Sequence, residues 1–308
     1  MSSTAAMNHQ HPASEQGITI VIPAYNEENG IGPVLAELRS ELHALGLESP
    51  LEVIIVNDGS KDKTGEAIAG HLSTYDDEMF RLVEHPQNRG YGAALKTGIR
   101  HATYPWILIT DADGTYPNEH IKDVLPHRDA FDMIVGARTG EHTNIPLIRR
   151  PPKWVLRKMA SVLSQQHIPD LNSGFRLMRK EVVERFFNIL PNGFSFTTTI
   201  TLAMFSTGHY VKYVPINYLK REGKSKIRPI ADTLNFVKLI VRTVMYFDPL
   251  RIFVPVSLLF FVASVTVGYV SWAQYGQVAD VTTVALFITS VHVFAIGMLA
   301  DMLNRRVD

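Results

Sequence analysis

Residues Trp106 to Pro117 read Trp-Ile-Leu-Ile-Thr-Asp-Ala-Asp-Gly-Thr-Tyr-Pro, and the rest of the chain is interpreted around them. The apolar start is typical of a buried strand that the Gly and Pro end, so Asp111 and Asp113 follow its carboxyl end. Residues two apart in an extended chain point the same way, and paired carboxylates repel unless a cation lies between them. Mg²⁺ is commonly bound by one or two carboxylates and phosphate oxygens. The stretch predicts a metal and diphosphate site, with an Asp-rich turn as the alternative.

The composition excludes several classes of protein. The 308 residues include 30 Lys and Arg and 30 Asp and Glu, so total charge predicts no affinity for nucleic acid. The chain has no Cys, which excludes disulfides, thiolate metal sites and a Cys nucleophile. None of the 12 His shows metal-ligand spacing on a helix, and all are interpreted as structural or surface residues. The polar residues 1–16 predict a disordered tail without a signal peptide.

Short apolar strands alternate with helices through the first half of the chain. Strands are expected at 18–23, 51–56, 80–84 and 131–136 besides the central one, and helices at about 31–44, around 64–68 and up to about 101. This alternation predicts an α/β domain with a mostly parallel sheet, whose ligands bind outside the carboxyl ends of the strands. The polar residues expected at that edge are Tyr25, Glu27, Asp58, Asp111, Asp113 and Arg138.

Several motifs, in this order, resemble family 2 glycosyltransferases of the GT-A (Rossmann-like) fold. They are Pro23-Ala-Tyr-Asn-Glu-Glu28, Val56-Asn-Asp-Gly-Ser60, Asn88-Arg-Gly-Tyr-Gly-Ala-Ala94 and Asp111-Ala-Asp-Gly114. Three later stretches are similar to the polyprenyl-phosphate branch, which includes dolichyl-phosphate mannose synthases: Asp170-Leu-Asn-Ser-Gly-Phe-Arg176, Phe194-Ser-Phe196 and Arg221-Glu-Gly-Lys-Ser-Lys226. The resemblance covers about residues 17–228.

The resemblance implies roles for residues at the sheet edge. Nucleotide base and ribose contacts fall on Pro23, Tyr25, Glu27 and Asp58, and Asp111 and Asp113 hold Mg²⁺ or Mn²⁺ with the donor diphosphate. Many relatives continue with Leu-Gln where this chain has Gly114-Thr115, which leaves a third protein ligand open. An acidic residue often follows Phe-Ser-Phe in relatives, whereas Thr197 to Thr199 follow here.

Some of these residues also have simpler interpretations. Asp58 before Gly59 could be a turn former. Gly90 and Gly92 could be helix-start glycines without a ligand. The stretch Asn172-Ser173-Gly174 could be an ordinary turn.

Two basic, amphipathic segments follow the central strand. The first gathers Arg149, Arg150, Lys153, Arg157 and Lys158 around Pro151-Pro152, before a helix with Trp154 and an aliphatic stripe. The second, 230–246, has Lys238 and Arg242 one turn apart. Such segments predict membrane-surface helices, and helices packed on the domain with a solvated basic face are the alternative. Their position before a membrane anchor favours the first interpretation.

Two uncharged apolar runs, 252–272 and 281–300, are long enough to span a bilayer as helices. The connection 273–280 has no Lys or Arg, whereas Lys238, Arg242, Arg251, Arg305 and Arg306 flank the outer ends. The positive-inside rule therefore predicts cytoplasmic termini and a cytoplasmic catalytic domain. His292 lies within the second span, where an ionisable group could be functional. A neutral His that faces the other helix is the expectation.

The predicted organisation is a tail (1–16), a GT-A catalytic domain (17–228), a juxtamembrane amphipathic helix (229–250) and a two-helix transmembrane anchor (251–308). The anchor favours a lipid acceptor, a polyprenyl phosphate in the cytoplasmic leaflet. A phosphate monoester is largely dianionic at pH 7, so no general base is expected. Donor and acceptor phosphates repel each other, and Arg or Lys must offset this.

Charged residues of the sheet edge and of the later motifs are the candidates for this chemistry. Asp113, Arg138 and Arg221 are expected to be catalytic, with phosphate contacts from Lys224, Ser225, Lys226 and Arg176. The cluster 221–226 could instead attract anionic lipid. The resemblance implies an inverting transfer, with GDP-mannose favoured as donor and a UDP-hexose as the alternative.

Other functions fit parts of the sequence. A processive polysaccharide synthase combines this fold with membrane helices, but the Gln-X-X-Arg-Trp pattern of that group is absent. A non-catalytic scaffold that binds sugar nucleotides would not need the Asp111 and Asp113 pair. The two spans could pack within one chain or between chains, so a homo-oligomer is an open alternative.

Overall fold

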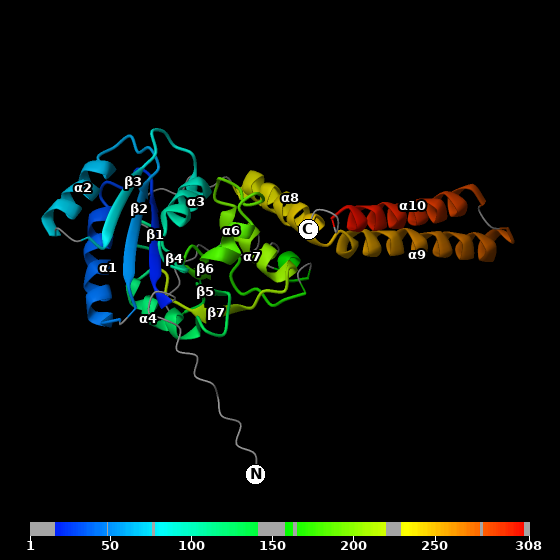
Figure 1. Ribbon diagram of the computed structural model, residues 1–308. Coiled ribbons are helices and arrows are strands. Elements are labelled where there is room, and N and C mark those ends of the chain that lie inside the picture. Colours follow the sequence, from blue (N-terminus) through cyan, green and yellow to red (C-terminus); the bar gives the residue numbers. More distant parts are fainter. Residues whose placement is uncertain are drawn as a thin grey trace, which may run out of the picture.

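The computed structural model describes residues 16–47, 49–75, 78–140, 158–162, 165–219, 229–277 and 280–304. These residues form a seven-stranded sheet with helices on both faces, followed by a helical hairpin that projects away from it (Figure 1). The strands are β1 (Ile18–Ala24), β2 (Leu51–Asn57), β3 (Phe80–Glu84), β4 (Trp106–Ile109), β5 (Met133–Ala137), β6 (Arg176–Arg179) and β7 (Val211–Pro215). Their order is β3-β2-β1-β4-β6-β5-β7, and only β6 runs antiparallel to its neighbours among these strands. The predicted mostly parallel sheet is confirmed.

Alternate residues of the central strands face two hydrophobic cores. Ile20 of β1 packs in the core that includes Leu35 of α1 (Ile31–Leu45), whereas Val21 packs in the core that includes Leu95 of α3 (Tyr91–His101). Further helices of this domain include α2 (Thr64–Tyr75), η2 (Asn118–His120), α4 (Ile121–Val124), η3 (Leu125–His127), α6 (Lys180–Arg185) and α7 (Phe196–Ser206). Strands buried on both faces read as continuous apolar runs, which is why their positions could be predicted.

Two short strands were not predicted. The sequence of β6, Arg-Leu-Met-Arg, is four residues long and ends in charges, and β7 mixes Lys and Pro with its Val residues. Neither is the continuous apolar run of a buried parallel strand. Pairing supplies their stability instead, because β6 lies between β4 and β5 and brings the loop before Arg176 to the edge where β4 and β5 end.

The helix α8 (Pro229–Phe247) lies between the sheet domain and the hairpin (Figure 1). Ile240 and Val244 are buried in a cluster with Leu202 of α7 and with Ala160, whereas Lys238 and Arg242 are exposed. At Ile240 and Val244 the apolar face of α8 therefore packs on the domain. This corrects the prediction that the segment 230–246 lies with that face on a membrane. Met245 and Tyr246, at the end that leads into the hairpin, are exposed. Trp154 and the basic residues 149–157 lie outside the described residues.

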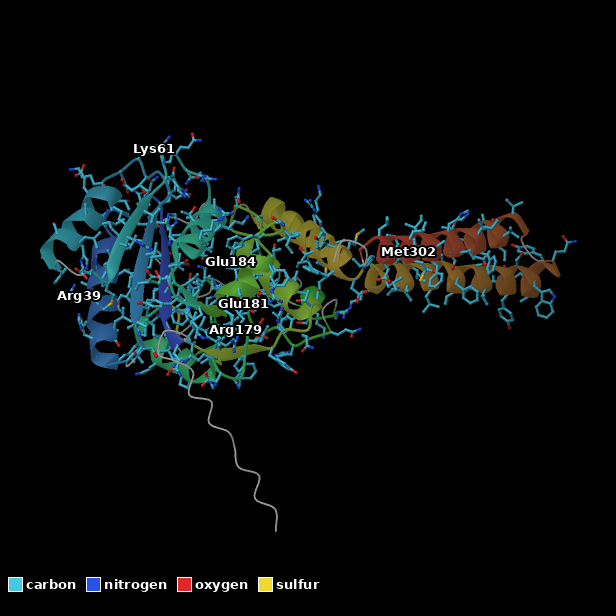
Figure 2. All side chains as sticks on the ribbon, viewed as in Figure 1. Arg39, Lys61, Arg179, Glu181, Glu184 and Met302 are labelled. Carbon is cyan, nitrogen blue, oxygen red and sulfur yellow. The ribbon has the colours of Figure 1, made fainter. Side chains whose placement is uncertain are left out.

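The hairpin consists of α9 (Leu250–Tyr275) and α10 (Asp280–Asn304), which lie side by side, with Met302 labelled on α10 (Figure 2). The segments Leu250–Tyr275 and Val281–Leu303 have mean hydropathies of 2.2 and 2.0 and are long enough to cross a membrane. Small residues form the contact. The Ser257 hydroxyl donates to the Ser290 carbonyl at 3.0 Å, and the Ser264 hydroxyl donates to the Thr283 carbonyl at 2.8 Å. Small residues allow the close backbone approach found between helices in membranes.

The packing face of α10 contradicts the expectation for His292. Thr283, Ser290 and Gly297 are spaced seven residues apart and contact α9, and a Cβ at Gly297 would lie 2.5 Å from the Cβ of Phe253. His292, two residues from Ser290, is rotated by about 200° around the helix axis. Its side chain is exposed on the opposite face. The prediction that it faces the other helix is therefore wrong.

Candidate active site

The loops after β1, β2, β4 and β5 meet at one edge of the sheet because these strands are parallel, and the loop before the antiparallel β6 arrives there too. Pro23 lies in β1 near this edge, and Tyr25 follows with 38% of its surface exposed. The predicted positions of Asp58, Asp111, Asp113 and Arg138 at the strand ends agree with the structure.

The Asp pair lies in the loop after β4, and both side chains are half-buried. Asp111 accepts a hydrogen bond from the Tyr91 hydroxyl, at 3.0 Å. Burial, followed by the charge of Asp111, raises the pKa of Tyr91 well above its usual value, so this hydroxyl remains a donor. Asp113 Oδ1 accepts from the backbone N–H and the hydroxyl of Thr115, at 3.1 and 2.7 Å. Many relatives have Leu-Gln where this chain has Gly114-Thr115. In this chain Thr115 orients the Asp113 carboxylate.

These donors fit a hard divalent cation. Carboxylate oxygens are the ligands that Mg²⁺ and Mn²⁺ prefer, and Mg²⁺ sites take further oxygens from substrate phosphates and water. A Cβ at Gly174 would lie 2.9 Å from Asp111 Oδ2, so only glycine leaves the space beside this carboxylate. In the part of the chain that the structure describes, no group of three or more His, Asp or Glu could hold a metal. A metal here would therefore depend on Asp111, Asp113 and oxygens of the substrate.

Arg138, at the end of β5, forms a bidentate ion pair with Asp170. Its Nε and one terminal nitrogen donate to the two carboxylate oxygens at 2.7 and 2.8 Å, and its backbone N–H also donates to Asp170 at 3.0 Å. Burial alone would raise the pKa of Asp170, but the charge and hydrogen bonds of Arg138 outweigh it and lower that pKa to about 2. The guanidinium also lies 5.2 Å from the centre of the Tyr218 ring. The orientation of Arg138 at the sheet edge is thus determined by Asp170 and Tyr218.

The loop 170–176 does not behave as an isolated turn. The Asn172 side-chain oxygen accepts from Thr198 on α7 at 2.6 Å, and the Gly174 N–H donates to the Tyr116 hydroxyl oxygen at 2.7 Å. Arg176 is fully buried. Its guanidinium donates to the carbonyls of Ser173 and Leu171 and to the Thr201 hydroxyl. The expectation that Arg176 contacts a substrate phosphate is corrected here, because its donors bind the protein interior.

The loops after β1 and β2 are joined by backbone and side-chain contacts. The Glu27 N–H donates to the Thr64 hydroxyl at 2.8 Å, and the Lys61 N–H donates to the Asn26 side-chain oxygen at 2.9 Å. A Cβ at Gly30 would lie 3.6 Å from a Glu27 carboxylate oxygen and 3.3 Å from the Ala112 carbonyl, which places Glu27 beside the Asp111–Asp113 loop. The predicted nucleotide contacts of Pro23, Tyr25, Glu27 and Asp58 stay predictions.

A hollow of about 530 Å³ lies between the loops after β2 and β3, with Ser60, Lys61, Gln87 and Asn88 in its wall. Asp58 is not part of this wall. It is buried, and both of its oxygens accept backbone N–H groups, from Arg89 at 2.9 Å and Gly90 at 2.8 Å. Asp58 is thus more than a turn former, since it organises the loop before α3.

Gly90 and Gly92 serve backbone packing. Cβ atoms at these positions would lie 2.5 Å from the Asn192 carbonyl oxygen and 2.2 Å from the Pro191 carbonyl oxygen. The N–H of Ala93 also donates to the Asn192 carbonyl, at 3.1 Å. This packing gives both glycines a structural role at the start of α3.

The predicted acceptor-phosphate residues lie outside the described residues: Arg221, Lys224, Ser225 and Lys226. Tyr91 and Asp170 lie inside the family motifs, but the sequence analysis did not predict them as site residues. The signal that could have identified Tyr91 is its place at a helix start beside the sheet edge, where a side chain can reach Asp111.

Comparison with known proteins gives two family matches. Residues 19–187 match the family described as "Glycosyl transferase family 2", and residues 248–305 match the one described as "GtrB C-terminal hairpin". A dolichyl-phosphate hexose transferase of Haloferax volcanii is 30% identical over 227 residues, which cover 73% of this chain and 92% of the relative. A bactoprenol glucosyl transferase of Shigella phage SfX is 28% identical over 300 residues, 94% of each chain.

Among solved structures, a similar fold occurs in glucosyl-3-phosphoglycerate synthase of Mycobacterium tuberculosis, solved with Mn²⁺, UDP-glucose and phosphoglyceric acid. The TM-score is 0.56 at 15% identity, over 74% of this chain and 78% of that one. This likeness covers the fold of the sheet domain, which carries the carboxylates described above.

Proposed function

The chain belongs to glycosyltransferase family 2, and we propose that it transfers a hexose from a nucleoside diphosphate sugar to a polyprenyl phosphate at the membrane surface. The observation that carries this proposal is the presence, on one chain, of the Asp111–Asp113 loop and the apolar hairpin of α9 and α10. A soluble acceptor would not require such an anchor, whereas a lipid phosphate would. The match of relatives named for dolichyl-phosphate and bactoprenol transfer supports the same acceptor class.

The proposed chemistry needs charge stabilisation more than proton transfer. The acceptor phosphate is largely dianionic at pH 7 and can attack the anomeric carbon directly, which inverts its configuration. Asp111 and Asp113 would hold Mg²⁺ or Mn²⁺, which supplies charge stabilisation to the departing nucleoside diphosphate. Arg138, which Asp170 orients at the sheet edge, is the arginine of the described residues that we assign to the substrate phosphates. We assign Arg221, Lys224, Ser225 and Lys226 to the acceptor phosphate on the family motif alone.

The hexose and nucleotide are the finer part of the proposal. The resemblance to dolichyl-phosphate mannose synthases favours GDP-mannose, whereas the relative that also covers the hairpin is named a bactoprenol glucosyl transferase. Glucose therefore stands beside mannose as the transferred sugar. Since no described residue at the site discriminates the two by a physical rule, both donors belong in the first experiment.

Charge distribution supports a cytoplasmic active site. Arg251 precedes the first span and Arg305 and Arg306 follow the second, whereas residues 273–280 carry no Lys or Arg. We accordingly place the catalytic domain (17–228) and both ends of the anchor (251–308) on the cytoplasmic side. The juxtamembrane helix (229–250) would then lie near the cytoplasmic leaflet.

The test is transfer from radiolabelled GDP- and UDP-sugars to a polyprenyl phosphate in detergent, with Mg²⁺, Mn²⁺ or a chelator. One donor is expected to label the lipid only with metal. Asp113→Asn should stop transfer, whereas the exposed Asp129→Asn should not, with melting curves confirming that both variants fold. Binding of a nucleotide sugar without lipid labelling would show that the acceptor assignment is wrong.

A further inference from the structure

Two buried side chains, Asp58 and His85, and the half-buried Thr97 form a hydrogen-bonded chain behind the sheet edge. His85, just after β3, lies 2.6 Å through Nδ1 from Asp58 Oδ1 and 2.9 Å through Nε2 from the Thr97 hydroxyl on α3. The side chains of His85 and Asp58 are 5% and 3% exposed. With Nδ1 protonated, the ring donates to the carboxylate, and Nε2 accepts the Thr97 proton. All polar positions of the imidazole are therefore used inside the protein.

This chain continues to the Asp pair. Asp58 accepts the N–H groups of Arg89 and Gly90, and Gly90 has a φ of +101°, a conformation that L side chains rarely adopt. The next residue, Tyr91, begins α3 and donates its hydroxyl to Asp111. Phe194 stacks on the Tyr91 ring, with centroids 5.4 Å apart, so the ring is held from a second side.

We infer that His85 is a positioning residue for Asp111, acting through Asp58, the Arg89 and Gly90 amides, and the Tyr91 hydroxyl. The inference rests on the proposed function, in which Asp111 holds the metal with the donor diphosphate. Groups that hydrogen-bond a metal-binding carboxylate determine its orientation, and their loss typically reduces metal affinity or activity by about 10- to 100-fold. His85 contacts neither substrate nor metal in this account. It keeps the Arg89–Tyr91 backbone where the hydroxyl can reach Asp111.

The experiment measures Mn²⁺ binding in the presence of UDP or GDP by electron paramagnetic resonance, without turnover, on the full chain in detergent. His85→Ala should raise the dissociation constant of Mn²⁺ by about tenfold. His85→Asn, whose amide N–H can replace the Nδ1 donor, should recover most of that loss. His43→Ala, on an exposed position of α1, is the matched control and should bind Mn²⁺ like the wild type.

A double-mutant cycle separates positioning from a general structural effect. Tyr91→Phe alone should weaken Mn²⁺ binding, and His85→Ala should then cost little more, because the hydroxyl through which it acts is gone. Additive losses, an unaltered affinity in His85→Ala, or failure of His85→Asn to recover binding would each overturn the inference. If His85→Ala does not fold, Thr97→Val replaces it in the cycle, with a smaller loss expected. A wild type that binds no Mn²⁺ with either nucleotide overturns the proposed function together with this inference.

Discussion

Arg138 and Asp170, with side chains 11% and 12% exposed, form a mostly buried, bidentate ion pair that joins the end of β5 to the loop before β6, with N–O distances of 2.7 and 2.8 Å. The pair links two segments that approach the site from opposite strand directions, since β6 runs antiparallel to β5. Asp170 also accepts the Asn172 N–H at 3.1 Å, and the side chain of Asn172 contacts α7. One carboxylate thus holds both a candidate phosphate-binding arginine and the loop that carries Gly174.

Asp170→Asn should destabilise the domain strongly. Removing one partner of a buried ion pair leaves an uncompensated charge, which costs about 3–5 kcal/mol. Urea unfolding in detergent, followed by fluorescence, measures the change. Glu181→Gln, at a position labelled in Figure 2, is the matched control. The pair of Glu181 with Arg185 is exposed, and such pairs are worth about 0–1 kcal/mol. Equal losses for the two variants would contradict the role given to Asp170.

The same pair predicts a pH dependence of stability. The pKa of Asp170 is about 2 in the folded protein and 3.8 ordinarily, so the unfolded chain binds more protons between these values. The contribution of the pair should be complete above about pH 4 and fall as the pH drops toward about 2. The difference in unfolding free energy between the wild type and Asp170→Asn, measured against pH, checks this. A difference that instead shrinks between pH 5 and 8 would rule it out.

Gly92→Ala should destabilise the domain and disturb the site. The new methyl group would lie 2.2 Å from the Pro191 carbonyl oxygen, so the 191–193 loop or α3 must move. Overpacking of this kind costs typically about 1–3 kcal/mol. Gly32→Ala, early in α1 with no atom within 4 Å of the added Cβ, is the matched control and should be neutral or stabilising. Thermal melting of both variants provides the comparison.

The hairpin can be tested by cross-linking, because the chain contains no native Cys. Cysteines at 257 and 290, where the serine hydroxyl oxygens are 3.2 Å apart, should form a disulfide under mild oxidation. Cysteines at 257 and 288 should not, because Ile288 is exposed away from the contact face. Mass spectrometry of peptides from the membrane-embedded protein distinguishes the two outcomes. Cross-linking in the control pair alone would reject the observed packing face.

Single cysteines can also test the proposed orientation. Lys61 lies on the sheet domain (Figure 2), and Gln277 follows the end of α9; each would be replaced by Cys. An impermeant maleimide added to intact cells should label position 277 and leave position 61 unlabelled until the membrane is opened. The reverse pattern would place the active site on the outer side.

Local sequence patterns predicted the carboxylates at the edge of the sheet. Asp111, Asp113 and Asp58 follow continuous apolar strands, and parallel strands bring their carboxyl ends to one edge. The positions of Arg176 and Asp58 relative to the surface could not be predicted. Arg176 is buried because the loop 170–176 folds against α7, and Asp58 is buried because the Arg89–Gly90 backbone covers it. Both contacts join residues that are distant in sequence.

The sequence by itself determined the sheet domain, the carboxylates at its edge and the two apolar spans. Buried strands, turns and long apolar helices each have a local sequence pattern that can be recognised without the structure. Tertiary structure alone decided which side chain each of these groups contacts. It paired Arg138 with Asp170, joined His85 to Asp58, turned α8 onto α7 and pointed His292 away from α9. These choices depend on packing between segments far apart in the chain, where one rotation of a helix or loop exchanges a buried contact for an exposed one.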